Sequence, residues 1–194
     1  MRRSLILSAA LALAALAARA EMVEIRYTHD WKWEGPAAPF LLARDKGYFE
    51  EEGLDVAMDA GAGSRESIPR VASGAYDIGF GDVNSLIKFR DQNPEIEVKA
   101  VLMVYNRPPF AIIGRRSLGV AAPRDLEGRV LGAPAPDAAY AQWNAFTEAA
   151  DVDPSRVTIE NVGFPVREPM LARGEVDAVA GFSFSSFINL KAAG

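Results

Sequence analysis

The stretch "IPRVASGAYDIGFG", residues 68–81, returns in outline as "EPMLARGEVDAVAG", residues 168–181. The two copies share Pro, Ala, Gly, Asp and Gly at a constant offset of 100 residues. Each copy predicts a short helix, a glycine where the helix stops, and a buried strand. Either one unit was duplicated, or two helix-to-strand joints converged on the same pattern. In both cases the chain contains two similar α/β units.

Strands and helices alternate on both sides of these copies. Apolar patterning predicts strands at 23–29, 54–60, 76–82, 97–105, 129–135, 156–162 and 176–182. Amphipathic segments predict helices at 38–53, 68–74, 84–93, 138–150, 168–174 and 184–194. This alternation favours an α/β fold in which mostly parallel sheets carry helices on both faces.

The alternation breaks at residues 106–117, "NRPPFAIIGRRS". Paired prolines cannot continue a central strand, and the residue before a proline is pushed to extended geometry. We therefore expect the chain to cross here from a first α/β lobe, residues 21–105, to a second lobe, residues 106–194. Two such lobes joined by a crossing have the layout of a protein that closes on a ligand.

The first twenty residues have the character of a cleavable export signal. Arg2 and Arg3 precede an apolar run at 5–17, and residues 18–20, "ARA", fit a small-x-small cleavage site. The run is shorter than the roughly 20 apolar residues that a membrane-spanning helix needs, so a membrane anchor is the less favoured alternative. We expect a periplasmic protein.

The composition argues against several classes of protein. The formal charge of −5 falls to −8 without Arg2, Arg3 and Arg19, so nucleic acid and anionic membrane surfaces are not expected partners. The absence of cysteine excludes thiol nucleophiles, cysteine metal sites and a lipid-modified cysteine. The one histidine, His29, has Asp30 beside it but no placed nucleophile, so a hydrogen-bonded or solvated role is favoured. We predict no cofactor, no metal and no enzymatic activity.

Candidate ligand contacts follow the predicted strands of the first lobe, because open α/β sheets bind ligands beyond the carboxyl ends of their strands. Trp31 and Trp33 lie in the polar loop "HDWKWEG", where at least one can offer a flat face to a planar or cationic ligand. The alternative is that these rings pack in the core or at the hinge and touch no ligand. Ser64 lies in the glycine-rich turn "GAGSRES", where simple helix capping is the alternative.

Further candidates lie at the carboxyl end of the third predicted strand and in the second lobe. Asp82 and Asn84 offer hydrogen bonds there, although Asn84 is equally suited to cap the following helix. Phe182 matches Asp82 in the repeat and is placed either to close over a ring or to pack in the core. Weaker candidates, for which surface or capping roles are favoured, are Tyr105, Asn106 and Asp137.

Five blocks of sequence resemble a known family: 30–56, 71–87, 108–114 ("PPFAIIG"), 125–135 ("DLEGRVLGAPA") and 167–182 ("REPMLARGEVDAVAGF"). They are similar to the periplasmic substrate-binding proteins of ABC importers, and most to the branch of sulfonate-binding and thiamine-pyrimidine-precursor-binding proteins. The resemblance implies a type II binding-protein fold, delivery of a solute to a membrane permease, and no catalysis. It also implies a cleft lined by Asp30, Trp31, Ser64, Asp82, Asn84 and Phe182.

The chain departs from the family pattern in two ways. Family members return to complete the first lobe, whereas this chain stops at Gly194, so we expect a fragment with apolar surface exposed on that lobe. The branch also includes an enzyme that builds the thiamine pyrimidine with a histidine and a cysteine-rich loop. Here the residues after Gly35 are "PAAPF", without histidine.

The predicted function is therefore that of a monomeric periplasmic solute-binding protein. Its expected ligand is a small planar or nitrogen-containing solute, and Asp82 favours a neutral or cationic solute over a free sulfonate. A pyrimidine-synthase-like enzyme and a remnant without transport function are the alternatives.

Overall fold

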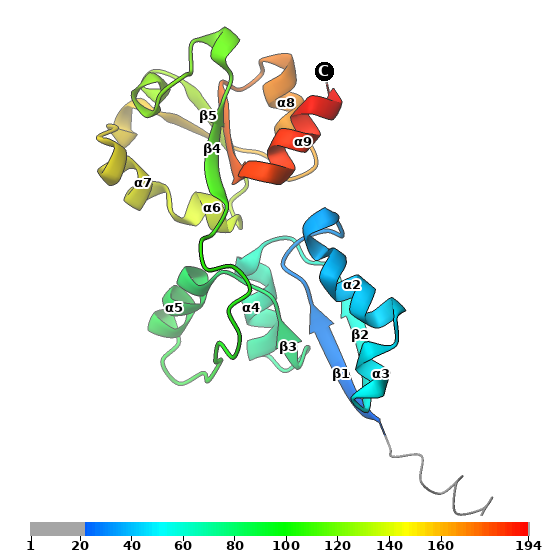
Figure 1. Cartoon of the computed structure of the whole chain (residues 1–194). Coiled ribbons are helices and arrows are strands. Elements are labelled where there is room, and N and C mark those ends of the chain that lie inside the picture. The colour runs from blue at the N-terminus through cyan, green and yellow to red at the C-terminus, as the bar shows by residue number, and fades with distance from the viewer. Residues whose placement is uncertain (1–21, 194) are drawn as a thin grey trace, which may run out of the picture.

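The computed structural model describes residues 22–193, and the predicted export signal at 1–20 lies outside the described residues. Figure 1 shows two α/β lobes joined by an extended segment of chain. One lobe has a three-stranded sheet of order β2-β1-β3, and the other a four-stranded sheet of order β4-β7-β5-β6. Neighbouring strands are parallel, except that β4 is antiparallel to β7. The predicted two-lobed α/β fold is confirmed.

The first lobe contains the smaller sheet. Its strands are β1 (Val23–Thr28), β2 (Leu54–Asp59) and β3 (Ile78–Gly79), and its helices are η1 (Gly35–Ala37), α2 (Ala38–Asp45), α3 (Tyr48–Glu51), α4 (Ser64–Ala72) and α5 (Val83–Gln92). The single helix predicted at 38–53 is two helices, because Gly47 adopts a φ of 76° between them. Helix α4 begins at Ser64, earlier than the predicted helix at 68–74.

The second lobe contains the larger sheet and both of the buried apolar clusters found in the described chain. Its strands are β4 (Phe110–Gly114), β5 (Val130–Ala133), β6 (Thr158–Asn161) and β7 (Ala178–Phe182). Its α-helices are α6 (Ala138–Ala141), α7 (Trp143–Ala150), α8 (Arg167–Arg173) and α9 (Ser183–Ala193), with short turns η2 (Arg116–Leu118), η3 (Pro123–Leu126) and η4 (Pro154–Arg156). Leu131 and Ala178 lie in one cluster, and Leu171 and Val179 lie in the other.

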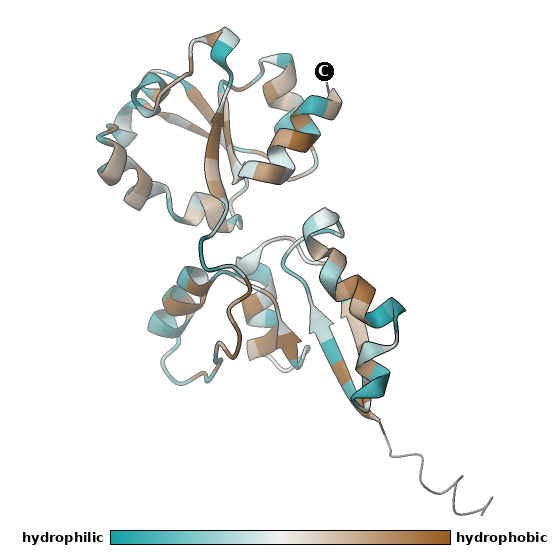
Figure 2. Cartoon of the chain, in the orientation of Figure 1, coloured by the Kyte–Doolittle hydropathy of each residue, from teal (hydrophilic) through white to brown (hydrophobic). Residues whose placement is uncertain are grey.

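The predicted strand at 97–105 is wrong. Val101 and Leu102 are 87% and 80% exposed, and Figure 2 shows this stretch as a hydrophobic loop that leads from α5 toward the second lobe. A strand forms only where a neighbouring strand satisfies its backbone, and β3, at the edge of the first sheet, has two residues. Apolar character alone therefore does not make this segment a strand.

Strand β4 forms inside the predicted crossing at 106–117. It directly follows Pro108 and Pro109 and lies at the edge of its sheet. Edge positions tolerate nearby prolines because one side of the strand has no ladder to complete. The prolines therefore mark the start of an edge strand rather than the absence of a strand.

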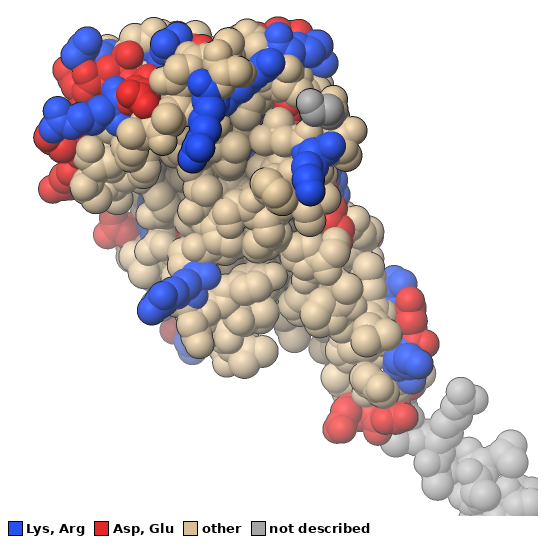
Figure 3. All heavy atoms as spheres, turned by 45° about the horizontal axis from the view of Figure 1, so that its top comes forward, with Lys and Arg blue, Asp and Glu red and all other residues tan. Residues whose placement is uncertain are grey.

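Charged side chains surround a largely uncharged face of the molecule. In the view of Figure 3 they gather around the rim of the second lobe and at the far end of the first, and the surface between them is mostly uncharged. Over residues 22–193, none of the helices combines the length and the apolar character that crossing a bilayer requires.

Candidate ligand-binding cleft

Two neighbouring cavities lie where the lobes meet. The first has an empty volume of about 360 Å³, partly open to solvent, and is lined by Asp30, Trp31, Gly63, Ser64, Asp137, Ala138, Phe164, Arg167, Phe182 and Ser185. The second has about 330 Å³, and its aromatic lining comprises His29, Trp31, Phe80, Tyr105, Phe182 and Phe184. Asp30, Trp31, Phe182 and Ser185 line both cavities and therefore lie at the boundary between them.

The lining residues come from the carboxyl ends of parallel strands. In the first lobe, His29, Asp30 and Trp31 directly follow β1. In the second lobe, Asp137 follows β5, Phe164 follows β6, and Phe182 is the last residue of β7. The cleft thus has the position at which open α/β sheets hold their ligands.

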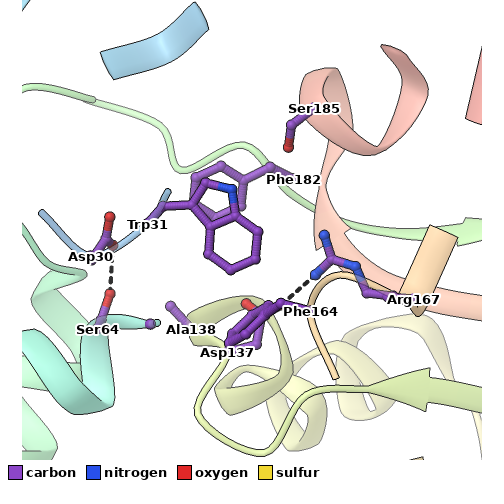
Figure 4. Close-up of a pocket in the computed structure, with 10 residues that line it drawn as sticks. Asp30, Trp31, Ser64, Asp137, Ala138, Phe164, Arg167, Phe182 and Ser185 are labelled. Carbon is purple, nitrogen blue, oxygen red and sulfur yellow. Dashed lines mark hydrogen bonds and ion pairs between the residues drawn. The ribbon is translucent and has the colours of Figure 1, made fainter. Parts of the chain in front are cut away.

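The Trp31 ring extends from the first lobe into the second (Figure 4). Its centroid lies 4.2 Å from that of Phe164 in an edge-to-face arrangement, and Arg167 Cζ lies 5.8 Å from the same ring. The indole Nε1 donates a hydrogen bond to Glu34 Oε2 at 3.1 Å. Contacts of these two kinds each contribute about 0.5–2 kcal/mol, so one aromatic ring helps to hold the two lobes together.

Asp30 forms the acidic wall of the first cavity. Its Oδ2 accepts a hydrogen bond from Ser64 Oγ at 2.8 Å, and the same hydroxyl oxygen accepts one from the Asp82 backbone N–H at 2.9 Å. Burial raises the pKa of Asp30 to about 6; the Ser64 hydrogen bond opposes the rise, and the charges of Asp137 and Asp82 add to it. Ser64 does not cap α4, because Gly63 holds the cap position.

A buried ionic network lies on the opposite side of the Trp31 ring. Arg167 Nη1 donates to Asp137 Oδ2 at 2.8 Å, and Nη2 and Nε donate to Glu168 Oε1 at 2.6 and 2.9 Å. Ser186 Oγ donates to the same Glu168 oxygen at 2.7 Å. Burial raises the pKa of Asp137 despite the nearby Arg167 charge. Burial also acts to raise the pKa of Glu168, but its hydrogen bonds and the Arg167 charge outweigh this and lower it.

His29 lies in the aromatic lining of the second cavity. Its Nδ1 is 2.8 Å from the Tyr27 hydroxyl, and its ring stacks on Trp33 at 5.3 Å and on Phe80 at 5.0 Å. Burial lowers the pKa of His29 to about 4, so the imidazole is neutral at pH 7. The histidine is hydrogen-bonded, which is one of the two roles favoured from the sequence.

The structure brings together some of the predicted site residues and separates others. Asp30, Trp31, Ser64 and Phe182 line the first cavity, and Tyr105 lines the second. The remaining three, Trp33, Asp82 and Asn84, are not among the residues that line either cavity. The contact of these eight residues with a ligand remains a prediction.

Each of these three residues has another place in the structure. Trp33 stacks on His29. The Asp82 carboxylate caps α5 by accepting from Ser85 N at 2.8 Å, and exposed Asn84 has its amide nitrogen 3.5 Å from Asp82 Oδ1. Asp82, and not Asn84, is therefore the cap of this helix.

Sequence reasoning missed Phe164 and Arg167, although the repeat contained a signal. The offset of 100 residues that relates 68–81 to 168–181 also pairs Ser64 with Phe164 and Ser67 with Arg167. Ser64 was a candidate, and applying the same offset to it would have led to Phe164. Both missed residues also lie just beyond a predicted strand, where ligand contacts are expected.

Comparison with solved structures defines the fold, and a family model defines the family. The alkanesulfonate-binding protein SsuA of Xanthomonas axonopodis pv. citri, bound to MOPS, superposes with a TM-score of 0.64 over 84% of this chain and 56% of that chain, at 15% identity. The fold is that of the two-lobed periplasmic binding proteins. The family described as "NMT1/THI5 like" matches residues 36–194, so the chain belongs to this family.

Three curated relatives match most of this chain but are longer than it. The riboflavin-binding protein RibY of Chloroflexus aurantiacus is 24% identical over 81% of this chain and 45% of its own length. The formylaminopyrimidine-binding protein of Halalkalibacterium halodurans is 28% identical over 83% of this chain and 47% of its own length. A protein of Aspergillus parasiticus named 4-amino-5-hydroxymethyl-2-methylpyrimidine phosphate synthase is 24% identical over 86% of this chain and 48% of its own length. The chain thus spans about half the length of the relatives it matches.

Proposed function

We propose that this chain is the solute-binding component of an ABC-type importer, and that it captures a small planar, nitrogen-containing solute between its lobes. The observation that carries the proposal is the cleft between the two lobes, whose lining combines the Trp31 and Phe182 rings with the buried polar groups of Asp30 and Ser64. The rings offer apolar faces to a flat solute, and the polar groups orient its edges. The solute is passed to a membrane permease unaltered.

Hinge closure is the proposed mechanism of capture. A solute that touches both lobes favours the closed state only to the extent that it binds that state more tightly than the open state. Direct contacts between the lobes are already present near the cleft, where Arg65 Nη1 donates to the Ala135 carbonyl oxygen at 2.8 Å. These contacts hold the lobes close enough for one small solute to bridge them.

The expected location is the periplasm, and the protein is expected to act there as a monomer. The export-signal pattern of residues 1–20 supports this location, as does the fold, which is shared with sulfonate-binding proteins described as periplasmic. The acidic wall at Asp30 favours neutral or cationic solutes, with a sulfonate as the alternative ligand.

A thermal-shift screen tests the proposal. The full chain is heated with pyrimidines, riboflavin, amines and alkanesulfonates, and a binder raises the melting temperature as its concentration exceeds its dissociation constant. Trp31→Ala is expected to remove most of the affinity, at least about tenfold, because one ring face is lost. Lys46→Ala, at an exposed position at the end of α2, is the control and retains binding. A flat response to the whole panel would refute the binding role.

An enzyme of pyrimidine synthesis is the second candidate, because one relative bears the name of a synthase. Such an enzyme would turn over a precursor or consume one of its own side chains. Mass spectrometry of the protein and of the candidate precursors after incubation distinguishes the two functions. Unchanged masses together with a melting shift support the binding protein, and a modified side chain or a new product supports the enzyme.

A further inference from the structure

Arg167 lies in the candidate ligand cleft, and its positive charge is already compensated by neighbouring carboxylates. Its side chain is 3% exposed and is held by two buried carboxylates, those of Asp137 and Glu168. Ser186 completes the network, with its Oγ 3.4 Å from Arg167 Nη2. Two carboxylates around one guanidinium leave no free positive charge for an anionic ligand.

The packing around Gly181 fixes the guanidinium in place. A Cβ at Gly181 would lie 2.9 Å from Arg167 Cζ and 2.7 Å from Ser186 Oγ, so the side chain of Arg167 rests against the bare backbone of β7. Its position is thus set by three hydrogen-bonding neighbours and by the strand behind it. Such a group forms a rigid flat surface rather than a mobile charge.

Aromatic rings already occupy the accessible side of this surface. Arg167 Cζ lies 5.8 Å from the Trp31 ring centroid and 5.9 Å from that of Phe164. In Figure 4 the indole lies between Arg167 and the pair formed by Asp30 and Ser64. An uncharged flat ring therefore fits against the guanidinium, and the Trp31 indole stands in for such a ring.

The other charged groups of the two cavities do not attract anions. Among the described residues that line them, the cations are Arg167 and Lys32, and Lys32 Nζ pairs with Glu34 Oε1 at 3.0 Å. Asp30 adds a carboxyl group whose partner is the Ser64 hydroxyl, a neutral group. The lining as a whole is neutral to acidic.

Building on the binding role proposed above, we propose that Arg167 and Phe164 form the specificity-determining platform of the cleft, which accepts an uncharged ring and rejects anions. Trp31 withdraws with the first lobe when the cleft opens, the solute ring stacks on the guanidinium, and Trp31 closes on the other side of that ring. Asp137 and Glu168 act through Arg167, to which both are bonded. They are positioning residues that cancel the Arg167 charge.

Chemical rescue tests the platform without knowledge of the natural solute. Trp31→Ala removes the indole that covers Arg167, and indole itself is the probe. We expect Trp31→Ala to bind indole, and to bind indole-5-sulfonate at least about tenfold more weakly, because that anion meets a compensated guanidinium beside Asp30. Wild-type protein, in which the Trp31 ring lies beside Arg167, is the reference for both probes. Equal binding of the two probes, or no binding of indole, would overturn the proposal.

A charge variant tests the role of the positioning residues. Adding Glu168→Gln to Trp31→Ala exposes part of the Arg167 charge, so the preference for indole over the sulfonate is expected to shrink by about tenfold. The matched control is Glu175→Gln, which breaks the exposed pair with Arg173 in the same lobe and leaves the preference unchanged. A preference that does not move in Glu168→Gln would contradict the assigned role.

A second measurement covers the case in which the double variant fails to fold. The Arg167 Nε–H resonance of Trp31→Ala, assigned by comparison with Trp31→Ala/Arg167→Lys, is followed by NMR as indole is added. Stacking predicts an upfield ring-current shift, and an unmoved resonance would overturn the platform.

The failure of this proposal is distinguishable from failure of the binding role. If wild-type protein responds to none of the screened solutes while Trp31→Ala binds indole selectively, the proposed importer function is refuted and the platform proposal is supported. If wild-type protein prefers an alkanesulfonate over every uncharged ring, the binding role is supported and the platform proposal is refuted.

Discussion

In the first lobe β1 lies between β2 and β3, and in the second lobe β5 lies between β6 and β7. The repeated aspartate joins β3 to β1 in the first lobe and β7 to β5 in the second lobe in the same way. Asp77 N donates to Arg26 O at 2.9 Å while its Oδ2 accepts from Arg26 N at 2.8 Å. Asp177 N donates to Val130 O at 2.9 Å while its Oδ2 accepts from Val130 N at 2.9 Å. The constant offset of 100 residues therefore marks equivalent places in two similar sheets.

The two copies differ where they face the cleft. The first copy is preceded by Ser64 and followed by Asp82, and the second is preceded by Phe164 and Arg167 and followed by Phe182. At these paired positions the first lobe has small polar residues, and the second lobe has aromatic rings and a compensated cation. The joints between helix and strand preserve the fold, while the positions beyond the strands are free to differ and form the cleft.

The largest expected effect is a loss of stability, and it differs between the last glycines of the two copies, Gly81 and Gly181. Gly181→Ala places a methyl group against Arg167 and Ser186 at less than 3 Å, whereas the nearest atom to the same group at Gly81 is Ile68 Cγ1 at 3.3 Å. Overpacking that also disturbs a buried ionic network is expected to lower the free energy of unfolding by about 3 kcal/mol, and Gly81→Ala by about 1 kcal/mol or less. Urea denaturation measures both values. Equal losses would show that the two glycines have the same role.

The next prediction compares the buried carboxyl groups of the two cleft walls. Asp30 has a hydroxyl partner and Asp137 has a guanidinium partner. The pKa of Asp30, about 6 in the folded state, lies above that of an unfolded aspartate, so its folded form keeps the proton between about pH 4 and pH 6. This contribution to stability is then fully present below pH 4 and falls by about 3 kcal/mol as the pH rises through 6.

Asp30→Asn is expected to abolish this fall, because an amide does not ionise and still accepts the Ser64 hydrogen bond. Asp137→Asn is the contrasting variant and is expected to destabilise the protein at pH 7, since it removes a charged acceptor from the buried Arg167. Chemical denaturation at pH 4, 5, 6 and 7 measures both effects. A pH dependence in Asp30→Asn equal to that of the wild type would assign the fall to another group.

Local sequence patterns were sufficient to predict part of this architecture. The repeat, the alternation of strands with helices and the break near Pro108 and Pro109 are all visible in neighbouring residues. The segment at 97–105 shows the limit, because an apolar run predicts a strand whether or not another strand lies beside it. Strand β4 shows the same limit in reverse, since its tolerance of prolines depends on an edge position that only the tertiary structure defines.

The sequence singled out the cleft mainly in its first-lobe half, and Phe182 was the main candidate from the second lobe. Asp30, Trp31 and Ser64 lie in loops whose polar, glycine-rich or aromatic character singles them out. Arg167 is one of many arginines, and its partners Asp137 and Ser186 are 30 and 19 residues away. A charge that is compensated through such distant contacts has no local signature, although the offset of the repeat leads to its position.

The smallest expected effect concerns the prolines that the two copies share. Pro69 is the sixth residue of α4, where it leaves the Arg65 carbonyl without its helical donor, whereas Pro169 is the third residue of α8, in a first turn that needs no such donor. Helix α4 still forms because Ser64 is bonded to Asp30 and the Ser67 hydroxyl donates to the Phe80 carbonyl at 2.7 Å.

Pro69→Ala is expected to restore that hydrogen bond and to raise the free energy of unfolding by about 1 kcal/mol, part of the gain being offset by a more flexible unfolded chain. Pro169→Ala, at a position compatible with proline, is expected to change it by less than about 0.5 kcal/mol. Urea denaturation of both variants measures the difference. If Pro69→Ala proves as neutral as Pro169→Ala, the anchors at Ser64 and Ser67, rather than the helical hydrogen bonds, determine the stability of α4.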